Sequence, residues 1–460
     1  MRGTVAAVAT VLLQAAMAAA GEPLRIDDPA DRQIVETFLK HTDSFRRMVT
    51  PEYCRKAAAE KITDYTWVIP RAVDTMLAAY QVAGDPKHLD HFVAMFAHCR
   101  EAMSRDASGY LGWYGKTLPG IVDPAEPDKK VDELLNSFAT TDLLARFIEA
   151  TDSDPALRTR FAAQRTEYLD LIEKHLIAKW DARGCFVDLA GRGAVYRGDT
   201  GLSATQTRLT KPHNMHSIVI QALLSLYRVT GKDEYMARAV TLGTRFKRCL
   251  TLKDGHYEWN YWDPAGPWDV HPTDSAKWKH WIGPEHTGHY YASTLSQAVA
   301  LYHHGVVFDR ADMDRFARTQ MTVCWNGDAE NPKWARVDGT TPTQYTVGEY
   351  VCPVLSPFDG KLADFVYGGP GQKRLLAQAA STWQSGILAT NWLRGKFFEM
   401  PAAAGGRPAC AHVGAKFRAV AANRDLLESL AFTVVEPGYM PPRTPSAMKE
   451  MPGEPPVPHP

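Results

Sequence analysis

The feature that most constrains the fold is a helix–turn–helix pattern that recurs along the chain. In residues 77–92 and 224–239, an apolar run with helical spacing ends at Gly84 or Gly231, and a polar turn and a second amphipathic run follow. A glycine directly after such a run is a typical helix stop, and Asp or Pro in the next turn is typical of a helix start. Two related segments are 146–161 and 300–316. Repeated helical hairpins predict either an open solenoid or a closed ring.

The connections between the hairpins favour the ring. Residues 105–130 and 255–288 are long and rich in Trp, Gly and Pro, whereas the repeats of a solenoid are shorter and more uniform. The sequence therefore predicts an all-α protein, an α/α toroid that forms an incomplete or closed barrel of helical hairpins, with long aromatic-rich loops at one end. An irregular helical enzyme without a ring is the alternative.

Apolar spacing predicts further helices over 131–150, 164–179 and 372–395. Two short segments, 185–189 and 417–421, are expected to be extended.

The ends of the chain have distinct compositions. Arg2, an apolar run over 5–19 and small residues before Gly21 are typical of a secretory signal peptide. We therefore expect a signal peptide at 1–20, a catalytic toroid at 21–400, a short extension at 401–436 and a Pro-rich flexible tail at 437–460. The predicted location is secreted or periplasmic, with no membrane attachment after cleavage of the signal.

Charge and cysteine content exclude some classes of protein. Lys and Arg together number 52, as do Asp and Glu, so nothing indicates a nucleic-acid partner. The seven cysteines include no CxxC pair, which argues against a zinc ribbon or a thioredoxin-type motif. The sequence does not indicate which cysteines pair or what the oligomeric state is.

Aromatic residues are concentrated between 207 and 350, in loops that are also rich in Gly and Pro. Flat rings that stack on sugar faces would account for this density, although many of the rings are expected to pack between helix ends instead. The predicted substrate-binding aromatic residues in this stretch are Trp259, Tyr261, Trp262 and Trp281. Two more, Trp113 and Trp67, lie earlier in the chain among other aromatic residues.

Two histidine-bearing motifs stand at the beginning of predicted helices. The first contains His213, Asn214 and His216, and the second contains His286 and His289 followed by Tyr290. Helix entries on the same side of a ring face the same space, so the two motifs are expected to converge. His216 and His286 are predicted to contact substrate.

These residue types suit β-elimination from a uronate. Removal of the proton beside a carboxylate requires that its charge be neutralised, which Asn214 with His213 or His216 could do. A base and an acid are also required, and His289 and Tyr345 are the predicted pair, with Tyr290 and Tyr291 open as alternatives. Arg336 is predicted to assist. The expected partner is therefore an anionic polysaccharide or oligosaccharide.

The helical repeats, the signal peptide and the Asn/His/Arg/Tyr set resemble the α/α-toroid polysaccharide lyases that act on alginate or glucuronan. The resemblance covers roughly residues 40–400 and implies a uronate-specific lyase, in which Asn214 and a nearby His neutralise the carboxylate and Arg336 and Tyr345 form the Arg-then-Tyr part. The Asn-Asn-His-Ser run of some alginate lyases is absent from this sequence.

Two other functions remain open. A glycoside hydrolase on the same scaffold would need two carboxylates, one of them protonated. A glycan-binding protein without activity would use only the aromatic residues. The candidate carboxylates are Asp64, Glu258, Asp263, Asp269, Glu285 and Asp338.

No cofactor is expected. The HxxH and EHxxH spacings nevertheless leave a metal at His213, His216, His286 and His289 as an alternative, because they place ligands one helical turn apart.

Overall fold

A computed structural model describes residues 23–341, 353–369, 383–401 and 408–430. It is mainly helical. The α-helices are α2 (Pro29–Met48), α3 (Pro51–Glu60), α4 (Asp64–Trp67), α5 (Ile69–Ala83), α6 (Lys87–Glu101), α7 (Leu134–Asp152), α8 (Pro155–Arg160), α9 (Ala162–Leu171), α10 (Ala178–Ala182), α11 (His213–Thr230), α12 (Asp233–Arg248), α13 (His289–His303), α14 (Arg310–Arg318), α15 (Gly360–Ala363), α17 (Trp383–Arg394), α19 (Ala411–Arg418) and α20 (Ala421–Ser429).

Short π- and 3₁₀-helices connect several of these. They are η1 (Ile172–Ile177), η2 (Pro267–Asp269), η3 (Thr319–Cys324), η4 (Pro353–Phe358), η5 (Asp364–Gly368) and η6 (Gly395–Glu399). In the described ranges the strands form four antiparallel pairs: β1 (Ser104–Arg105) with β2 (Leu111–Gly112), β3 (Phe186–Asp188) with β4 (Ala194–Tyr196), β5 (Thr251–Lys253) with β6 (His256–Glu258), and β7 (Val270–His271) with β8 (Asp274–Trp278).

The four predicted hairpins are present as α5–α6, α11–α12, α7–α8 and α13–α14. Two of them turn at the predicted glycines. Gly84 and Gly231 adopt left-handed backbone conformations with φ of 67° and 69°. Their N–H groups donate to the carbonyl oxygens of Tyr80 and Tyr227, each over 2.8 Å, and so satisfy carbonyls that the helix end leaves open.

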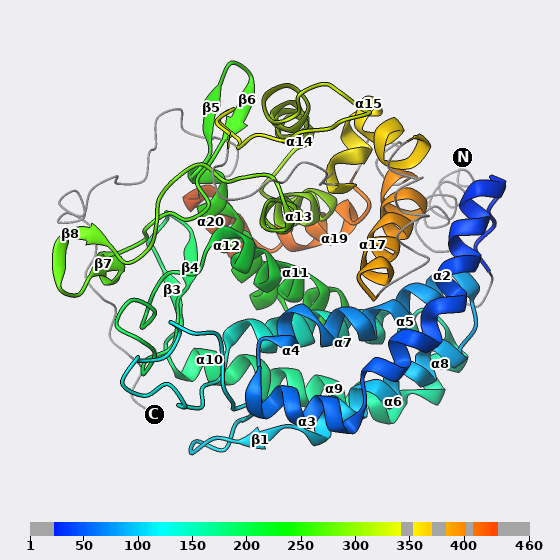
Figure 1. Cartoon of the computed structure of the whole chain (residues 1–460), viewed down its shortest axis with the longest axis horizontal. Coiled ribbons are helices and arrows are strands. Elements are labelled where there is room, and N and C mark those ends of the chain that lie inside the picture. Colours follow the sequence, from blue (N-terminus) through cyan, green and yellow to red (C-terminus); the bar gives the residue numbers. More distant parts are fainter. Residues whose placement is uncertain (1–22, 342–352, 370–382, 402–407, 431–460) are drawn as a thin grey trace.

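The hairpins close into a ring. Along it α2 packs on α5, α5 on α7, α7 on α11 and α11 on α13, and the circuit returns through η4, η6 and α17 to α2 and α5. Figure 1 shows α11 between α7 and α13. A second layer lies outside, where α6 covers α5, α9 and η1 cover α7, and α12 covers α11. The predicted α/α toroid is therefore confirmed.

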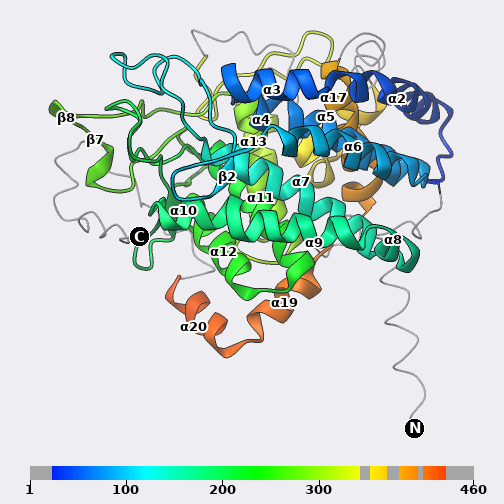
Figure 2. The same ribbon diagram turned by 90° about the horizontal axis from the view of Figure 1, so that it is seen from below.

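The long connections lie together at one side of the molecule. Figures 1 and 2 both place β7, β8 and the loop that precedes α7 at the side opposite α2 and α8. These connections carry the four β-ribbons. The core is one large apolar cluster between the two helical layers, and a small second cluster around Val187 and Trp268 lies under the ribbons.

The shorter sequence predictions have mixed outcomes. The extended segment at 185–189 is confirmed by β3, but the one at 417–421 is wrong, because α19 continues to Arg418 and α20 begins at Ala421. A short run such as Phe-Arg-Ala-Val does not distinguish strand from helix by its spacing. The late helix is present as α17, whereas 370–382 lies outside the described residues. The division of the chain at 20, 400 and 436 stays a prediction, and the segments 1–20 and 437–460 are not described.

Cysteine pairing was left open by the sequence. Cys54 Sγ and Cys99 Sγ lie 3.9 Å apart, between α3 and α6, and both thiols are buried. The six described cysteines are all free thiols. Within the described ranges, no helix has the length and apolar character that a membrane span requires.

Candidate functional site

Three extended segments lie side by side at the entry to α13 and form the scaffold of the candidate site. Tyr261 N–H donates to Gly283 O over 2.9 Å, and Glu285 N–H donates to Trp259 O over 3.1 Å. On the other side, Val337 N–H donates to Glu285 O over 2.9 Å. The segment that contains Glu285 is therefore the central one of the three.

The inner side of this scaffold is fully buried. Trp259, Glu285 and Val337 are all in the core. Successive residues of an extended chain point to opposite sides. Accordingly His286 and Arg336, which pair across an isolated bridge, are only half-buried. Arg336 makes no ion pair with the described residues, and its Nε has no hydrogen-bond partner among them.

An aromatic surface covers the scaffold. It consists of Tyr261, His280, Trp281 and Tyr290, which we call the platform. The ring of Tyr261 lies 5.6 Å from that of His280 and 5.6 Å from that of Tyr290. The Trp281 indole lies over the backbone of Gly283, where a Cβ would collide with it.

Trp281 and Tyr290 are 50% and 41% exposed, in a structure that exposes few large apolar side chains. Exposed neighbouring rings of this kind are typical of a binding surface.

Glu285 lies on the central segment of the scaffold, and its carboxyl group has no access to solvent. The Trp259 indole N–H donates to one of its oxygens, and the Thr294 hydroxyl bonds to the other over 3.0 Å. Burial raises the pKa of Glu285 to about 8, because two neutral donors offset only part of the cost of a buried charge. The group is therefore protonated at neutral pH.

The other candidate carboxylates are engaged in local structure. Asp64 accepts from Tyr53 and pairs with Lys61, Glu258 pairs with Lys253, and Asp338 caps its own loop at Thr340. Asp269 accepts from Thr210 and from backbone N–H groups of the turn at Ala265. Asp263 bonds to His213. Glu285 is the candidate that combines a raised pKa with a position on the segment paired with Tyr261.

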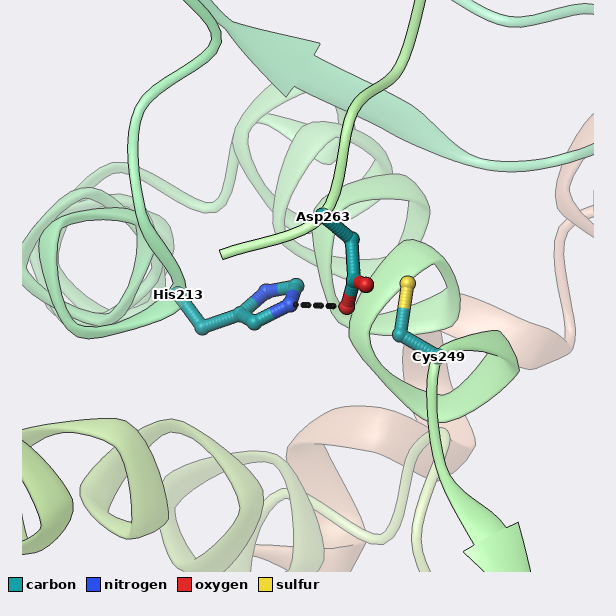
Figure 3. A group of neighbouring side chains, drawn as sticks. All are labelled: His213, Cys249 and Asp263. Carbon is teal, nitrogen blue, oxygen red and sulfur yellow. Dashed lines mark hydrogen bonds and ion pairs between the residues drawn. The ribbon is translucent and has the colours of Figure 1, made fainter. Parts of the chain in front are cut away.

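His213 is the first residue of α11. Its Nε2 lies 3.0 Å from Asp263 Oδ2, as Figure 3 shows, and Asn260 Nδ2 donates to the other carboxylate oxygen over 2.7 Å. All three residues lie beside the platform, because the His213 N–H donates to Tyr261 O over 3.4 Å. The structure thus joins the first histidine motif to the loop that carries the platform.

The first histidine motif contacts α13, the helix that the second motif begins. Gln297 on α13 donates from Nε2 to His213 O over 3.2 Å, and Ser293 Oγ donates to Asn214 O over 3.0 Å. The side chains of the first motif, however, point into the protein. Asn214 is fully buried, and neither of its amide atoms has a hydrogen-bond partner among the described residues.

His216 is committed to the backbone. The Tyr196 N–H donates to its Nε2 over 2.8 Å, and burial lowers the pKa of His216 to about 3, so the ring is a neutral acceptor. Contact between His216 and substrate is therefore not supported in this conformation, and its Nε2 is not available for the metal at four histidines that the sequence left open.

Of the remaining predicted site residues, two lie at or near the surface, and the side chains of the other two are not described. Tyr290 is exposed, and His286 is half-buried with its ring 6.4 Å from that of Tyr290; burial lowers the pKa of His286. Tyr345 lies outside the described residues, as does the side chain of His289. Proton transfer by His289 and Tyr345 thus stays an untested prediction.

Several predicted sugar contacts are core residues. Trp113 stacks on Tyr65 with ring centroids 4.1 Å apart, and Trp262 donates its indole N–H to Thr210 O over 2.8 Å. Trp259 is buried as well, so none of these three indoles can stack on a sugar in this conformation. Trp67 is half-buried beneath the Arg71 guanidinium.

Sequence reasoning missed two features of this region. It did not identify His280 as part of the platform, and it did not connect Cys249 with His213 and Asp263. Neither residue belongs to a recognisable motif, and both acquire their neighbours only through the packing of α12 and the loop after β6.

Comparisons with known proteins give little sequence similarity. No protein-family model matches the chain, and no curated protein matches it. Among solved structures, it resembles the α-1,6-mannanase GH76A of Salegentibacter sp. HEL1_6, an inactive variant in complex with α-1,6-mannotriose. The identity is 12% and the TM-score is 0.43, over 83% of this chain and 99% of the mannanase. That likeness is too low to assign an activity to this chain.

The prediction of a polysaccharide lyase for alginate or glucuronan is wrong in this comparison, because the matched protein is a hydrolase. The hydrolase alternative agrees with it better. In the described site, Asn214, His213 and His216, the residues predicted to neutralise a uronate carboxylate, are all buried.

Proposed function

We propose that this protein is a glycoside hydrolase in which the platform binds a sugar chain and Glu285 supplies the proton to the leaving oxygen. The observation that supports this most directly is a carboxyl group with a pKa of about 8 on the segment whose backbone pairs with that of the platform residue Tyr261. Cleavage of a glycosidic bond needs an acid that still carries its proton at the working pH, and burial is the usual means of keeping it.

The platform suits the substrate that such an acid would serve. Sugar rings have apolar faces that pack on Trp and Tyr, whose polar atoms can bond to hydroxyl groups at the edge. Tyr261, Trp281 and Tyr290 offer such faces. Arg336, which makes no ion pair with described residues, lies next to His286, so we also propose that the sugar chain is acidic. Export through the predicted signal peptide would bring the enzyme to such polymers.

A glycan-binding protein without activity is the second candidate. It is favoured by the burial of Glu285, because both carboxyl oxygens already have partners and a substrate would have to displace the Thr294 hydroxyl. The platform alone would then carry the function.

Activity on a panel of neutral and acidic polysaccharides tests the proposal. The panel includes α-1,6-mannan and several uronate polymers, and two products are measured: new reducing ends and the ultraviolet absorbance of unsaturated uronates. We expect reducing ends without that absorbance. Glu285→Gln should lower the rate about 100-fold or more while binding persists, since loss of an acid or base costs about 10²–10⁴-fold.

Matched variants separate chemistry from binding. Tyr290→Ala should weaken binding of the best substrate several-fold, because a stacking contact contributes about 0.5–1.5 kcal/mol. Glu126→Gln, an exposed carboxylate that pairs with Lys129, serves as the control and should change neither measurement. Binding without reducing ends would support the second candidate, and unchanged turnover in Glu285→Gln would refute the proposed role of Glu285.

A further inference from the structure

A second cluster of reactive groups lies beneath the loop that carries the platform. His213 begins α11, Cys249 follows the last residue of α12, and Asp263 lies in the loop after β6. One nitrogen, one sulfur and one oxygen of these side chains all lie within 4.8 Å of one another. Figure 3 shows the imidazole and the carboxylate directed toward each other, with the thiol beside the carboxylate. All three residues are buried.

We propose that His213, Cys249 and Asp263 bind a zinc ion. Imidazole nitrogen, thiolate sulfur and carboxylate oxygen are the ligands that zinc takes in proteins, at about 2.0–2.3 Å. Ligand atoms around a tetrahedral zinc are separated by about 3.3–3.8 Å on those bond lengths. His213 Nε2 and Asp263 Oδ2 already lie 3.0 Å apart, so small side-chain shifts would open the cluster enough to admit the ion.

Neighbouring residues hold two of the three ligands in position. Asn260 Nδ2 donates to Asp263 Oδ1 over 2.7 Å, which leaves Oδ2 directed at the cluster. The His213 ring packs on Phe246, with centroids 5.0 Å apart. Partners of this kind orient the ligands of natural metal sites, and they reduce the entropy that binding would otherwise cost.

The proton balance of binding is simple. Zinc takes the place of the thiol proton of Cys249, which is released to solvent. His213 binds as the neutral ring through Nε2 with its proton on Nδ1, and Asp263 binds as the carboxylate. The resulting thiolate and carboxylate together carry a charge that offsets that of the ion, as burial requires. Burial raises the pKa of the Cys249 thiol while no ion is bound, whereas the nearby Arg245 favours the thiolate form.

The zinc ion would connect the loop that carries the platform to α11 and to the end of α12. Tyr261 precedes Asp263 by two residues, and its carbonyl accepts from the His213 N–H. The described residues supply no fourth His, Cys, Asp or Glu, so a water molecule completes the coordination. The proposed zinc therefore positions the loop, and this role does not depend on the reaction that the platform serves.

Metal content and cobalt spectroscopy of the full-length protein test this proposal. Protein produced with added zinc and then dialysed against metal-free buffer should retain about one zinc per chain. Cobalt in place of zinc should give a near-ultraviolet thiolate-to-cobalt band. Cys249→Ser should lose the band, and both Cys249→Ser and Asp263→Asn should bind zinc at least ten-fold more weakly. Cys185→Ser, which changes another buried cysteine outside the cluster, should retain the zinc and the band.

If a variant fails to fold, the zinc content and the cobalt band of the wild-type protein still test the proposal. Wild-type protein without retained zinc and without the cobalt band would overturn the proposal, as would a band that persists in Cys249→Ser. Neither result bears on glycan cleavage, so the zinc proposal and the hydrolase proposal can fail separately.

Discussion

Replacement of Glu285 by Gln should remove a specific pH dependence from the stability of the fold. Gln keeps the shape of the side chain and can still bond to the Trp259 indole N–H and the Thr294 hydroxyl through its carbonyl oxygen and amide. It cannot ionise. Any difference between wild type and variant that changes with pH therefore reports the ionisation of Glu285.

The direction of this pH dependence follows from the pKa of Glu285 in the unfolded and in the folded protein. The ordinary pKa of a Glu is 4.5, whereas burial raises the pKa of Glu285 to about 8 in the folded protein. Below pH 4.5 the Glu285 carboxyl is protonated in both the folded and the unfolded chain, and its contribution to the free energy of unfolding is fully present. As the pH rises toward 8 the unfolded chain ionises and the folded one does not, so stability is lost. The loss is about 1.4 kcal/mol per pH unit and at most about 5 kcal/mol in total.

Urea unfolding at pH 5, 6, 7 and 8 measures the effect. The free energy of unfolding of the wild type, taken relative to Glu285→Gln at the same pH, should fall steadily across this series. Glu126→Gln is the control, and its curve should follow that of the wild type, because Glu126 is exposed.

A difference between wild type and Glu285→Gln that stays constant from pH 5 to pH 8 would refute the reasoning. Glu285 would then be ionised at neutral pH, and it could not serve as the acid that the hydrolase proposal requires.

Two further predictions concern the stability of the helical fold. Asp132→Asn should destabilise the fold by about 3–5 kcal/mol in urea unfolding, because it leaves the buried Lys179 ammonium, now 2.6 Å from the carboxylate, without its closest counter-ion; an effect under 1 kcal/mol would contradict this. Gly231→Ala should cost only about 1 kcal/mol, since its left-handed backbone faces open space, whereas Gly115→Ala should cost more because its Cβ would collide with Ala58 O. Equal losses in the two glycine variants would show that the collision is relieved by a local shift.

The sequence by itself determined the helical hairpins. A left-handed glycine after an apolar run and an aspartate or proline at the next helix start act within a few residues, so Gly84 and Gly231 could be identified without knowledge of the fold. The contact between α11 and α13, the helices that the two histidine motifs begin, also agrees with the predicted ring, whereas the meeting of the histidine side chains stays a prediction.

The tertiary structure alone decided which of those residues are accessible and what state they are in. Nothing in the local sequence distinguishes buried Trp262 from exposed Trp281. The raised pKa of Glu285 comes from its burial, which the hydrogen bonds from Trp259 and Thr294 only partly offset. The contact of Cys249 with the His213–Asp263 pair likewise depends on how α12 meets the loop after β6. Burial, pKa and ligand geometry come from groups that are distant along the chain, and local spacing carries no information about them.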